Sequence, residues 1–149
     1  YAEKMTLALG LGGGSLVVRQ TYAWSDFQFD GDKIYRDHRM PVVPEHQYRL
    51  ALKYAHPSGL FIEPSLDWRP KSVFVDYANT LKAPSYTVVN LDLGVRLDNG
   101  VSLFLDARNL TDERYAAEFG AVTDARTAAT DVFYPGEGRS VFVGAAYRF

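Results

Sequence analysis

A period-two alternation of apolar and polar residues constrains the fold of this chain more than any other feature. In YTVVNLDLGVRL (residues 86–97), Thr87, Val89 and four further apolar residues occupy every second position. The intervening positions hold Asn90, Asp92, Gly94 and Arg96. Successive side chains of a strand point to opposite faces of a sheet, so this pattern predicts a strand with one apolar and one polar face. The turn signal DNG at 98–100 and the alternating stretch VSLFLDARN after it predict a hairpin.

The same pattern predicts about seven strands and no other regular structure. We expect the strands at residues 3–11, 15–29, 46–56, 60–74, 84–97, 101–115 and 138–149. Short turns at 12–14, 56–59 and 98–100 alternate with long connections at 30–45, 75–83 and 116–137. This regular asymmetry is typical of outer-membrane barrels, whose short turns are periplasmic and long loops extracellular. The predicted fold class is all-β, built of antiparallel transmembrane β-barrel strands.

Pro64 and the segment 129–135 complicate this strand assignment. Pro64 falls on the apolar face of a predicted strand, and proline cannot donate a ladder hydrogen bond, so we expect a local bulge there. A further strand near 129–135 would raise the number of strands to eight. Bacterial single-chain barrels have even strand numbers, so seven strands predict part of a larger barrel and eight would permit a complete small one.

A soluble lipocalin-like barrel also shows alternation, and three features favour the membrane instead. Aromatic residues lie near the ends of the apolar faces, as in the aromatic girdles of outer-membrane barrels; they include Tyr48, Tyr54 and Trp68. The opposite face carries charges of both signs in the middle of its strands. The loop asymmetry extends over the whole chain. No window is long and apolar enough for a transmembrane helix.

Composition narrows the possible functions further. The net charge is −2, from 16 basic and 18 acidic residues, which argues against a nucleic-acid partner. Cysteine is absent, so we expect neither a disulfide framework nor a thiolate metal site. The three histidines lie far apart without a nucleophile partner, so we expect no catalytic residues, no metal site, no cofactor and no enzymatic activity. The first residue is Tyr1 and no signal peptide follows, so we expect that the start was removed by processing or that the chain is a fragment.

Three short motifs, in order, carry a resemblance to a known family. A P-x-x-P-x-H stretch (Pro41, Pro44, His46) leads into a strand, an N-L-T-D-x-x-Y box (109–115) ends a late strand, and P-G-x-G-R (135–139) leads into a final strand ending in Phe149. Together they span about residues 40–149 and resemble the C-terminal part of TonB-dependent outer-membrane receptors.

The resemblance implies the fold and the partners of the whole protein. Residues 1–149 would be the C-terminal segment of a 22-stranded barrel whose plug domain and energy-coupling box are absent from this sequence. The family imports scarce, bulky nutrients, mostly ferric siderophores, and couples to TonB through the plug. The resemblance also implies outer-membrane lipid around the barrel and recognition of VFVGAAYRF by the barrel-assembly machinery, with Tyr147 and Phe149 in the assembly signal. A small outer-membrane barrel with a structural or adhesive role and a soluble lipocalin-like small-molecule binder are the alternatives.

Two sets of residues are candidates for function. Charged residues on the polar faces are expected to face the lumen and to pair with one another or with a plug: Arg49, Lys53, Glu63, Asp67, Arg69, Asp92, Arg96, Asp106, Arg108 and Arg148. Cationic and aromatic residues of the long connections would suit an anionic ferric complex: Arg36, His38, Arg39, Tyr77, Arg126 and Tyr134.

Overall fold

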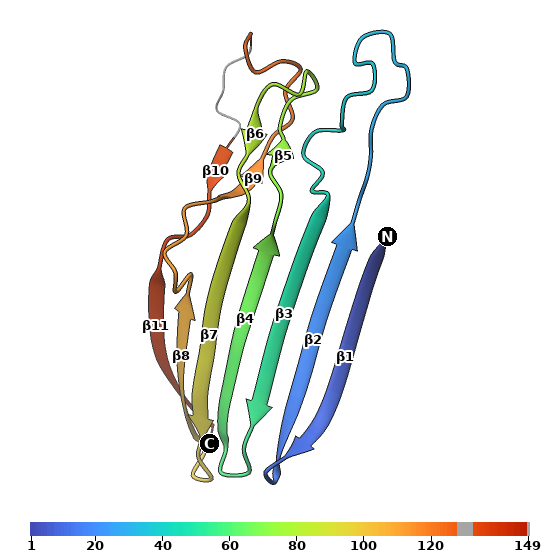
Figure 1. Cartoon of the computed structure of the whole chain (residues 1–149). Coiled ribbons are helices and arrows are strands. Elements are labelled where there is room, and N and C mark those ends of the chain that lie inside the picture. Colours follow the sequence, from blue (N-terminus) through green and yellow to red (C-terminus); the bar gives the residue numbers. More distant parts are fainter. Residues whose placement is uncertain (128–132, 149) are drawn as a thin grey trace.

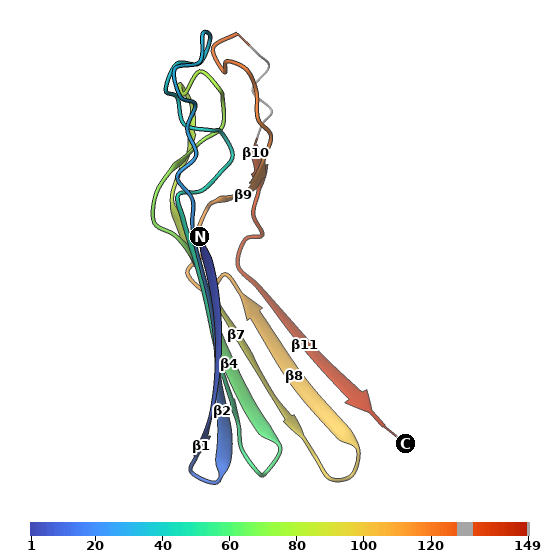
Figure 2. The same cartoon turned by 90° about the vertical axis from the view of Figure 1, so that its right-hand side faces the viewer.

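Seven long antiparallel strands form one sheet in the computed structural model, which describes residues 1–127 and 133–148. In spatial order they are β1 (Ala2–Leu11), β2 (Gly14–Trp24), β3 (His46–Ala55), β4 (Leu60–Arg69), β7 (Tyr86–Arg96), β8 (Val101–Arg108) and β11 (Ser140–Tyr147) (Figure 1). Each long strand pairs with the next long strand along the chain, so the topology of the main sheet is a simple meander. Figure 2 shows that the sheet is curved, with β8 and β11 turned away from β1 and β2.

The register confirms the predicted alternation of faces. Leu93 pairs with Leu105, and Leu105 pairs with Val143, so the apolar positions of three adjacent strands share one face. On the opposite face Arg49 pairs with Asp67. A shift of one residue in any strand would exchange the two sets, so these pairs fix the strand registers.

The connections also alternate as predicted. The short turns lie at one end of the sheet and the long connections at the other (Figure 1). Two small antiparallel ladders within the long connections were not predicted: β5 (Val73–Phe74) with β6 (Lys82–Ala83), and β9 (Ala116–Phe119) with β10 (Phe133–Pro135). The described part of the chain contains no helix that is long and apolar enough to cross a membrane.

Three predicted strands end earlier than expected. The strand predicted at 15–29 ends at Trp24, the one at 60–74 ends at Arg69, and the one at 101–115 ends at Arg108. For β8 the cause is local, because Asn109 has a φ of 47°, a left-handed conformation that cannot continue a strand. β11 ends at Tyr147, and Phe149 lies outside the described residues.

The bulge predicted at Pro64 is wrong. Pro64 pairs in register with Leu91 of β7. Between β3 and β4 the ladder is interrupted at Pro64, yet the register is the same on both sides, with Ala51 opposite Ser65 and Tyr54 opposite Ile62. The missing amide therefore costs ladder pairs without shifting the strand.

The possible eighth strand does not join the main sheet. Of the segment 129–135, only residues 133–135 are described, and they form β10, which pairs with β9 in a separate ladder. The main sheet keeps seven strands, and its edge strands β1 and β11 do not pair with each other. In the described residues the sheet is therefore open, as expected for part of a barrel.

The buried apolar residues lie in the long connections and on the adjoining parts of β7 and β8. Val75 and Ala83 are fully buried, with Leu81, Phe119 and Val122 packed against them. The apolar face of the sheet is largely uncovered, and Val143 is 78% exposed. So large an uncovered apolar surface requires a partner outside this chain or an apolar solvent.

Candidate ligand-facing connections and polar face

Charges on the polar face of the sheet neutralise one another across neighbouring strands. Arg49 Nε lies 3.1 Å from Asp67 Oδ2, and Lys53 Nζ lies 3.4 Å from Glu63 Oε2. Arg19 also forms an ion pair with Glu63. The register places Arg49 beside Asp67 on neighbouring strands, whereas Arg19 of β2 reaches Glu63 of β4 across the intervening strand β3. The mutual pairing expected from the sequence is therefore present for these carboxylates.

The remaining charged residues of this face differ in their environments. Arg108 Nη2 lies 2.6 Å from Asp106 Oδ2, while Asp92 lies opposite Asp106 in the register. Arg69 is only 3% exposed, donates from Nη2 to the Pro84 carbonyl (2.8 Å), and stacks on the ring of Tyr86. Arg96 ends β7 at the end of the sheet that carries the short turns. Arg148 follows β11 at the same end, where its backbone amide donates to Gly100.

A cavity of about 450 Å³ lies on the polar face, where the strands meet the long connections. Its lining includes Asp67, Asp92, Asp106 and Arg108 from the sheet. Tyr115 of the connection after β8 also lines the cavity. Sequence reasoning did not assign Tyr115 to a site, although it belongs to one of the motifs that carried the resemblance.

Asn109 joins the start of the connection between β8 and β11 to its end. The side chain is 1% exposed, accepts a hydrogen bond from the Glu113 amide (2.8 Å) and donates to the Glu113 carbonyl (2.9 Å). It also donates to the Glu137 carbonyl (2.9 Å), which lies just before β11. The N-L-T-D-x-x-Y box (109–115) therefore contacts the P-G-x-G-R motif (135–139) directly.

Two further contacts join the same motifs. Arg139 donates its backbone amide to Asp112 Oδ1 at 3.2 Å, and their side chains approach to 3.9 Å. A Cβ atom on Gly136 would lie 2.2 Å from the Tyr115 ring, so only glycine permits this packing. We call these three contacts (Asn109–Glu137, Asp112–Arg139 and Tyr115–Gly136) the neck of the connection.

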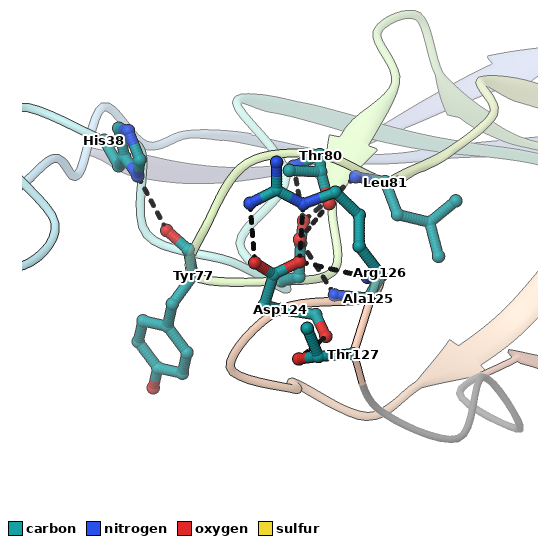
Figure 3. A network of polar contacts seen from close by, with 9 residues as sticks. His38, Tyr77, Thr80, Leu81, Asp124, Ala125, Arg126 and Thr127 are labelled. Carbon is teal, nitrogen blue, oxygen red and sulfur yellow. Dashed lines mark hydrogen bonds and ion pairs between the residues drawn. The ribbon is translucent and has the colours of Figure 1, made fainter.

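Buried Asp76 organises the contact between two long connections, and its partners Thr80, Leu81 and Ala125 are labelled in Figure 3. Its carboxylate accepts hydrogen bonds from the Thr80 amide (2.8 Å), the Thr80 hydroxyl (2.5 Å) and the Leu81 amide (3.0 Å), all within the connection between β4 and β7. The Ala125 amide of the connection between β8 and β11 donates to the same carboxylate at 3.2 Å. One side chain therefore fixes the shape of one connection and the position of the other.

The electrostatics of this junction favour ionised carboxylates. Burial is the largest single influence on Asp76 and opposes ionisation, but the hydrogen bonds from Thr80, Leu81 and Ala125 together hold its pKa below the ordinary value. Next to it, the hydrogen bond from Arg126 lowers the pKa of Asp124 to about 2. Arg126 is thus part of an ion pair, with Nη2 2.6 Å from Asp124 Oδ2.

The connection between β2 and β3 completes this assembly. His38 Nδ1 lies 2.8 Å from the Tyr77 carbonyl (Figure 3). Asn79 accepts from the Arg39 amide and donates to the Arg39 carbonyl, at 2.8 and 2.9 Å. Three aromatic rings, those of Phe29, Tyr35 and Tyr77, cluster beside these contacts. The Tyr35 ring centroid lies 5.2 Å from that of Phe29 and 5.2 Å from that of Tyr77, and the Phe29 and Tyr77 centroids are 6.1 Å apart.

The structure brings together some of the ligand candidates. His38, Arg39 and Tyr77 lie at one junction, and Arg126 follows Ala125, which binds the same connection through Asp76. Arg36 and Tyr134 are exposed and lie apart from those hydrogen bonds. A role in ligand binding stays a prediction for all of them. Tyr147 pairs with Val101 at the end of β11, and its role in assembly also stays a prediction.

Glu45 gathers three cationic or ionisable side chains where β3 begins. It forms ion pairs with Lys71 and with Arg39 Nη1 (2.7 Å), and its Oε1 lies 3.1 Å from His46 Nε2. The hydrogen bond from Lys71 is the main reason that the pKa of Glu45 lies at about 2. Within the described residues, no group of three His, Asp or Glu side chains is placed to hold a metal ion.

Comparisons with known proteins identify a family and two solved structures that match this chain. A family model described as "TonB dependent receptor-like, beta-barrel" matches residues 6–110. The siderophore receptor PiuA from Acinetobacter baumannii matches 97% of this chain with a TM-score of 0.69 and 24% identity. The ferric yersiniabactin uptake receptor FyuA from Yersinia pestis matches 97% with a TM-score of 0.66 and 19% identity. The chain corresponds to 21% and 22% of the length of those two proteins, and at these identities the likeness shows a shared fold.

Proposed function

We propose, from the premise that this chain belongs to the TonB-dependent receptor β-barrel family, that residues 1–149 are the C-terminal barrel segment of an outer-membrane receptor. The observation that carries the proposal is the family match over residues 6–110, on a sheet that does not close in the described residues. An open sheet gives no support to a complete small barrel, and the family differs from that of lipocalins. PiuA is a siderophore receptor and FyuA is a ferric yersiniabactin uptake receptor.

In this proposal the apolar face of the sheet contacts outer-membrane lipid and the polar face lines the lumen. The uncovered apolar side chains support this orientation, because they match the outward apolar band of a transmembrane barrel. The ion pairs of Arg49 with Asp67 and of Lys53 with Glu63 support a wet, neutralised interior. The long connections are then extracellular and the short turns periplasmic.

The proposed activity is energy-coupled uptake of a scarce nutrient, and a ferric siderophore is the proposed ligand. The first contacts would come from the extracellular connections. Of the three arginines proposed as ligand contacts, Arg36 has no ion pair with a described residue, whereas Arg39 and Arg126 each pair with carboxylates. The rings of Phe29, Tyr35 and Tyr77 offer an aromatic surface, and Arg36 directly follows Tyr35 in the sequence. Coupling would pass to TonB through a plug domain, and the barrel-assembly machinery would insert the protein.

Uptake by cells tests the proposal directly. The full-length receptor is expressed in cells that lack it, and radiolabelled iron is supplied as ferric catecholate or ferric hydroxamate complexes. We expect uptake that stops when the proton-motive force is collapsed, while equilibrium binding of the complex to the cells persists. Arg36→Gln should weaken that binding severalfold, because one unpaired cation is removed from the outer surface.

The outcomes separate the parts of the proposal. Energy-dependent uptake of haem or cobalamin, without uptake of either iron complex, would retain the receptor and overturn the ligand class. Absence of energy-dependent uptake of any of these nutrients would overturn the transport function itself. Unchanged binding by Arg36→Gln would remove Arg36 from the ligand contacts.

A further inference from the structure

An aromatic row crosses the apolar face at the end that carries the long connections. Tyr22 pairs in register with Tyr48, and Tyr48 pairs with Trp68, so the three rings lie side by side on β2, β3 and β4. With Pro70 and Lys71 they line a cavity of about 310 Å³. Aromatic side chains of this kind concentrate where a bilayer meets water.

A cationic groove adjoins that cavity. It has a volume of about 400 Å³, and its charged lining residues are Arg39, Lys71, Lys82 and Glu45. Pro70 and Lys71 line both spaces, so the groove and the aromatic cavity share a wall. Lys82 Nζ lies 4.4 Å from the centroid of the Phe74 ring.

The groove has a surplus of positive charge. Glu45 partly neutralises Lys71 and Arg39, and Asp26 lies 3.6 Å from Arg39. Lys82 has no carboxylate partner in the described part of the chain, so the three cations exceed the two carboxylates. A surplus cation beside an aromatic cavity, at the edge of an apolar face, complements a molecule that has an anionic head and an apolar tail.

We propose that this joint site binds a phosphorylated acyl lipid. The phosphate lies in the groove between Lys71 and Lys82, and an acyl chain passes over the aromatic row of Tyr22, Tyr48 and Trp68 onto the apolar face. A free phosphate ion would use the groove alone and would gain nothing from the aromatic cavity, so an acyl lipid complements the joint site better. The site rests on the proposed orientation of the apolar face toward lipid.

Native mass spectrometry of the full-length receptor in detergent tests the proposal. The probes are dipalmitoyl phosphatidic acid, dipalmitoylglycerol with the same acyl chains but no phosphate, and inorganic phosphate. The wild-type receptor should bind phosphatidic acid in preference to dipalmitoylglycerol, and inorganic phosphate should not displace it. Lys82→Gln and Lys71→Gln should each weaken binding of phosphatidic acid about fivefold, since one surface cation contributes about that factor.

Two matched variants guard against a general effect of charge or of folding. Lys33→Gln removes an exposed lysine that does not line the groove and should leave binding unchanged. Glu45→Gln removes the competing carboxylate and should strengthen binding, a gain that a damaged fold would not produce.

Each alternative outcome overturns a stated part of the proposal. Equal binding of phosphatidic acid and dipalmitoylglycerol, or full binding by Lys82→Gln, would show that the groove does not hold the phosphate. Displacement by inorganic phosphate at comparable concentration would replace the lipid with a free anion. Iron uptake measured on the same variants separates this site from the transport proposal, because loss of lipid selectivity with normal uptake leaves the latter intact.

Discussion

Replacing Asn109 should open the neck of the connection between β8 and β11. Its side chain makes three hydrogen bonds with backbone groups, at 2.8 Å with the Glu113 amide and at 2.9 Å with the Glu113 and Glu137 carbonyls. Its φ of 47° is a left-handed conformation, which asparagine tolerates better than alanine does. Asn109→Ala therefore removes the bonds and strains the backbone at the same time.

The expected cost follows from these two contributions. Each hydrogen bond contributes about 1 kcal/mol net, so their loss costs about 3 kcal/mol. Alanine in a left-handed conformation adds about 1 kcal/mol, which gives about 4 kcal/mol in total. Asn109→Gly loses the bonds without that strain and should cost about 3 kcal/mol by the same account. Asn109→Asp retains the acceptor for the Glu113 amide but loses both donated bonds.

Hydrogen exchange of the intact receptor measures the opening of the neck without requiring global unfolding. The Glu113 amide should exchange more than a hundredfold faster in Asn109→Gly, because about 1.4 kcal/mol corresponds to a factor of ten. Asn109→Ala should exchange faster still. Unaltered protection of Glu113 in both variants would refute the assignment of Asn109 as the residue that closes the neck. Equal protection in the alanine and glycine variants would refute only the contribution of backbone strain.

Three other predictions concern the faces, the connections and the chain end. Leu93→Arg should destabilise the receptor in bilayers by about 2–4 kcal/mol and Asp92→Arg by less, and the reverse order in urea unfolding would show that the faces are exchanged. Because the pKa of Asp76 is lowered, its contribution to the stability of the junction should be complete above its ordinary pKa of 3.8 and should be lost as the pH falls through the lowered pKa. The Ala125 amide should then become exposed to hydrogen exchange. An exchange rate at Ala125 that shows no such loss of protection at low pH would contradict the role of Asp76. Phe149→Ala should strongly reduce the amount of receptor in the outer membrane but should lower the melting temperature of the assembled receptor only slightly. Normal abundance with a large loss of stability would make Phe149 a packing residue instead.

The strands of the sheet could be predicted because their signal is local. Residues such as Leu91, Asp92 and Leu93 alternate faces through backbone geometry alone, and one apolar face suffices to fix the register. The strand ends were predicted less well. The early end of β8 depends on the left-handed backbone of Asn109, and a single asparagine in a sequence does not reveal its φ. Pro64 indicated an interruption of strand pairing. The ladder with β3 is interrupted there, whereas the ladder with β7 is continuous, and the sequence does not distinguish these two neighbours.

The candidate site was less predictable because its contacts join distant segments. The Ala125 amide binds a carboxylate 49 residues earlier in the chain, and no periodic pattern indicates that Asp76 is buried. The sequence correctly identified cations in the connections. It did not show that Arg39 is paired with Glu45. For the ion pair of Arg126 with Asp124 a signal was available, because Asp124 lies only two residues before Arg126 in the sequence.

The neck also makes the length of the connection between β8 and β11 independent of the pairing of the sheet strands. Because Tyr115 and Gly136 are already held together, residues added between them extend a loop whose ends are fixed. The entropy cost of such a loop grows only with the logarithm of its length, about 0.6 kcal/mol for each doubling. β8 and β11 would keep their register whatever the loop carries. Evolution can therefore remodel the outer surface of such a receptor by insertion and deletion, while the motif residues of the neck stay under constraint.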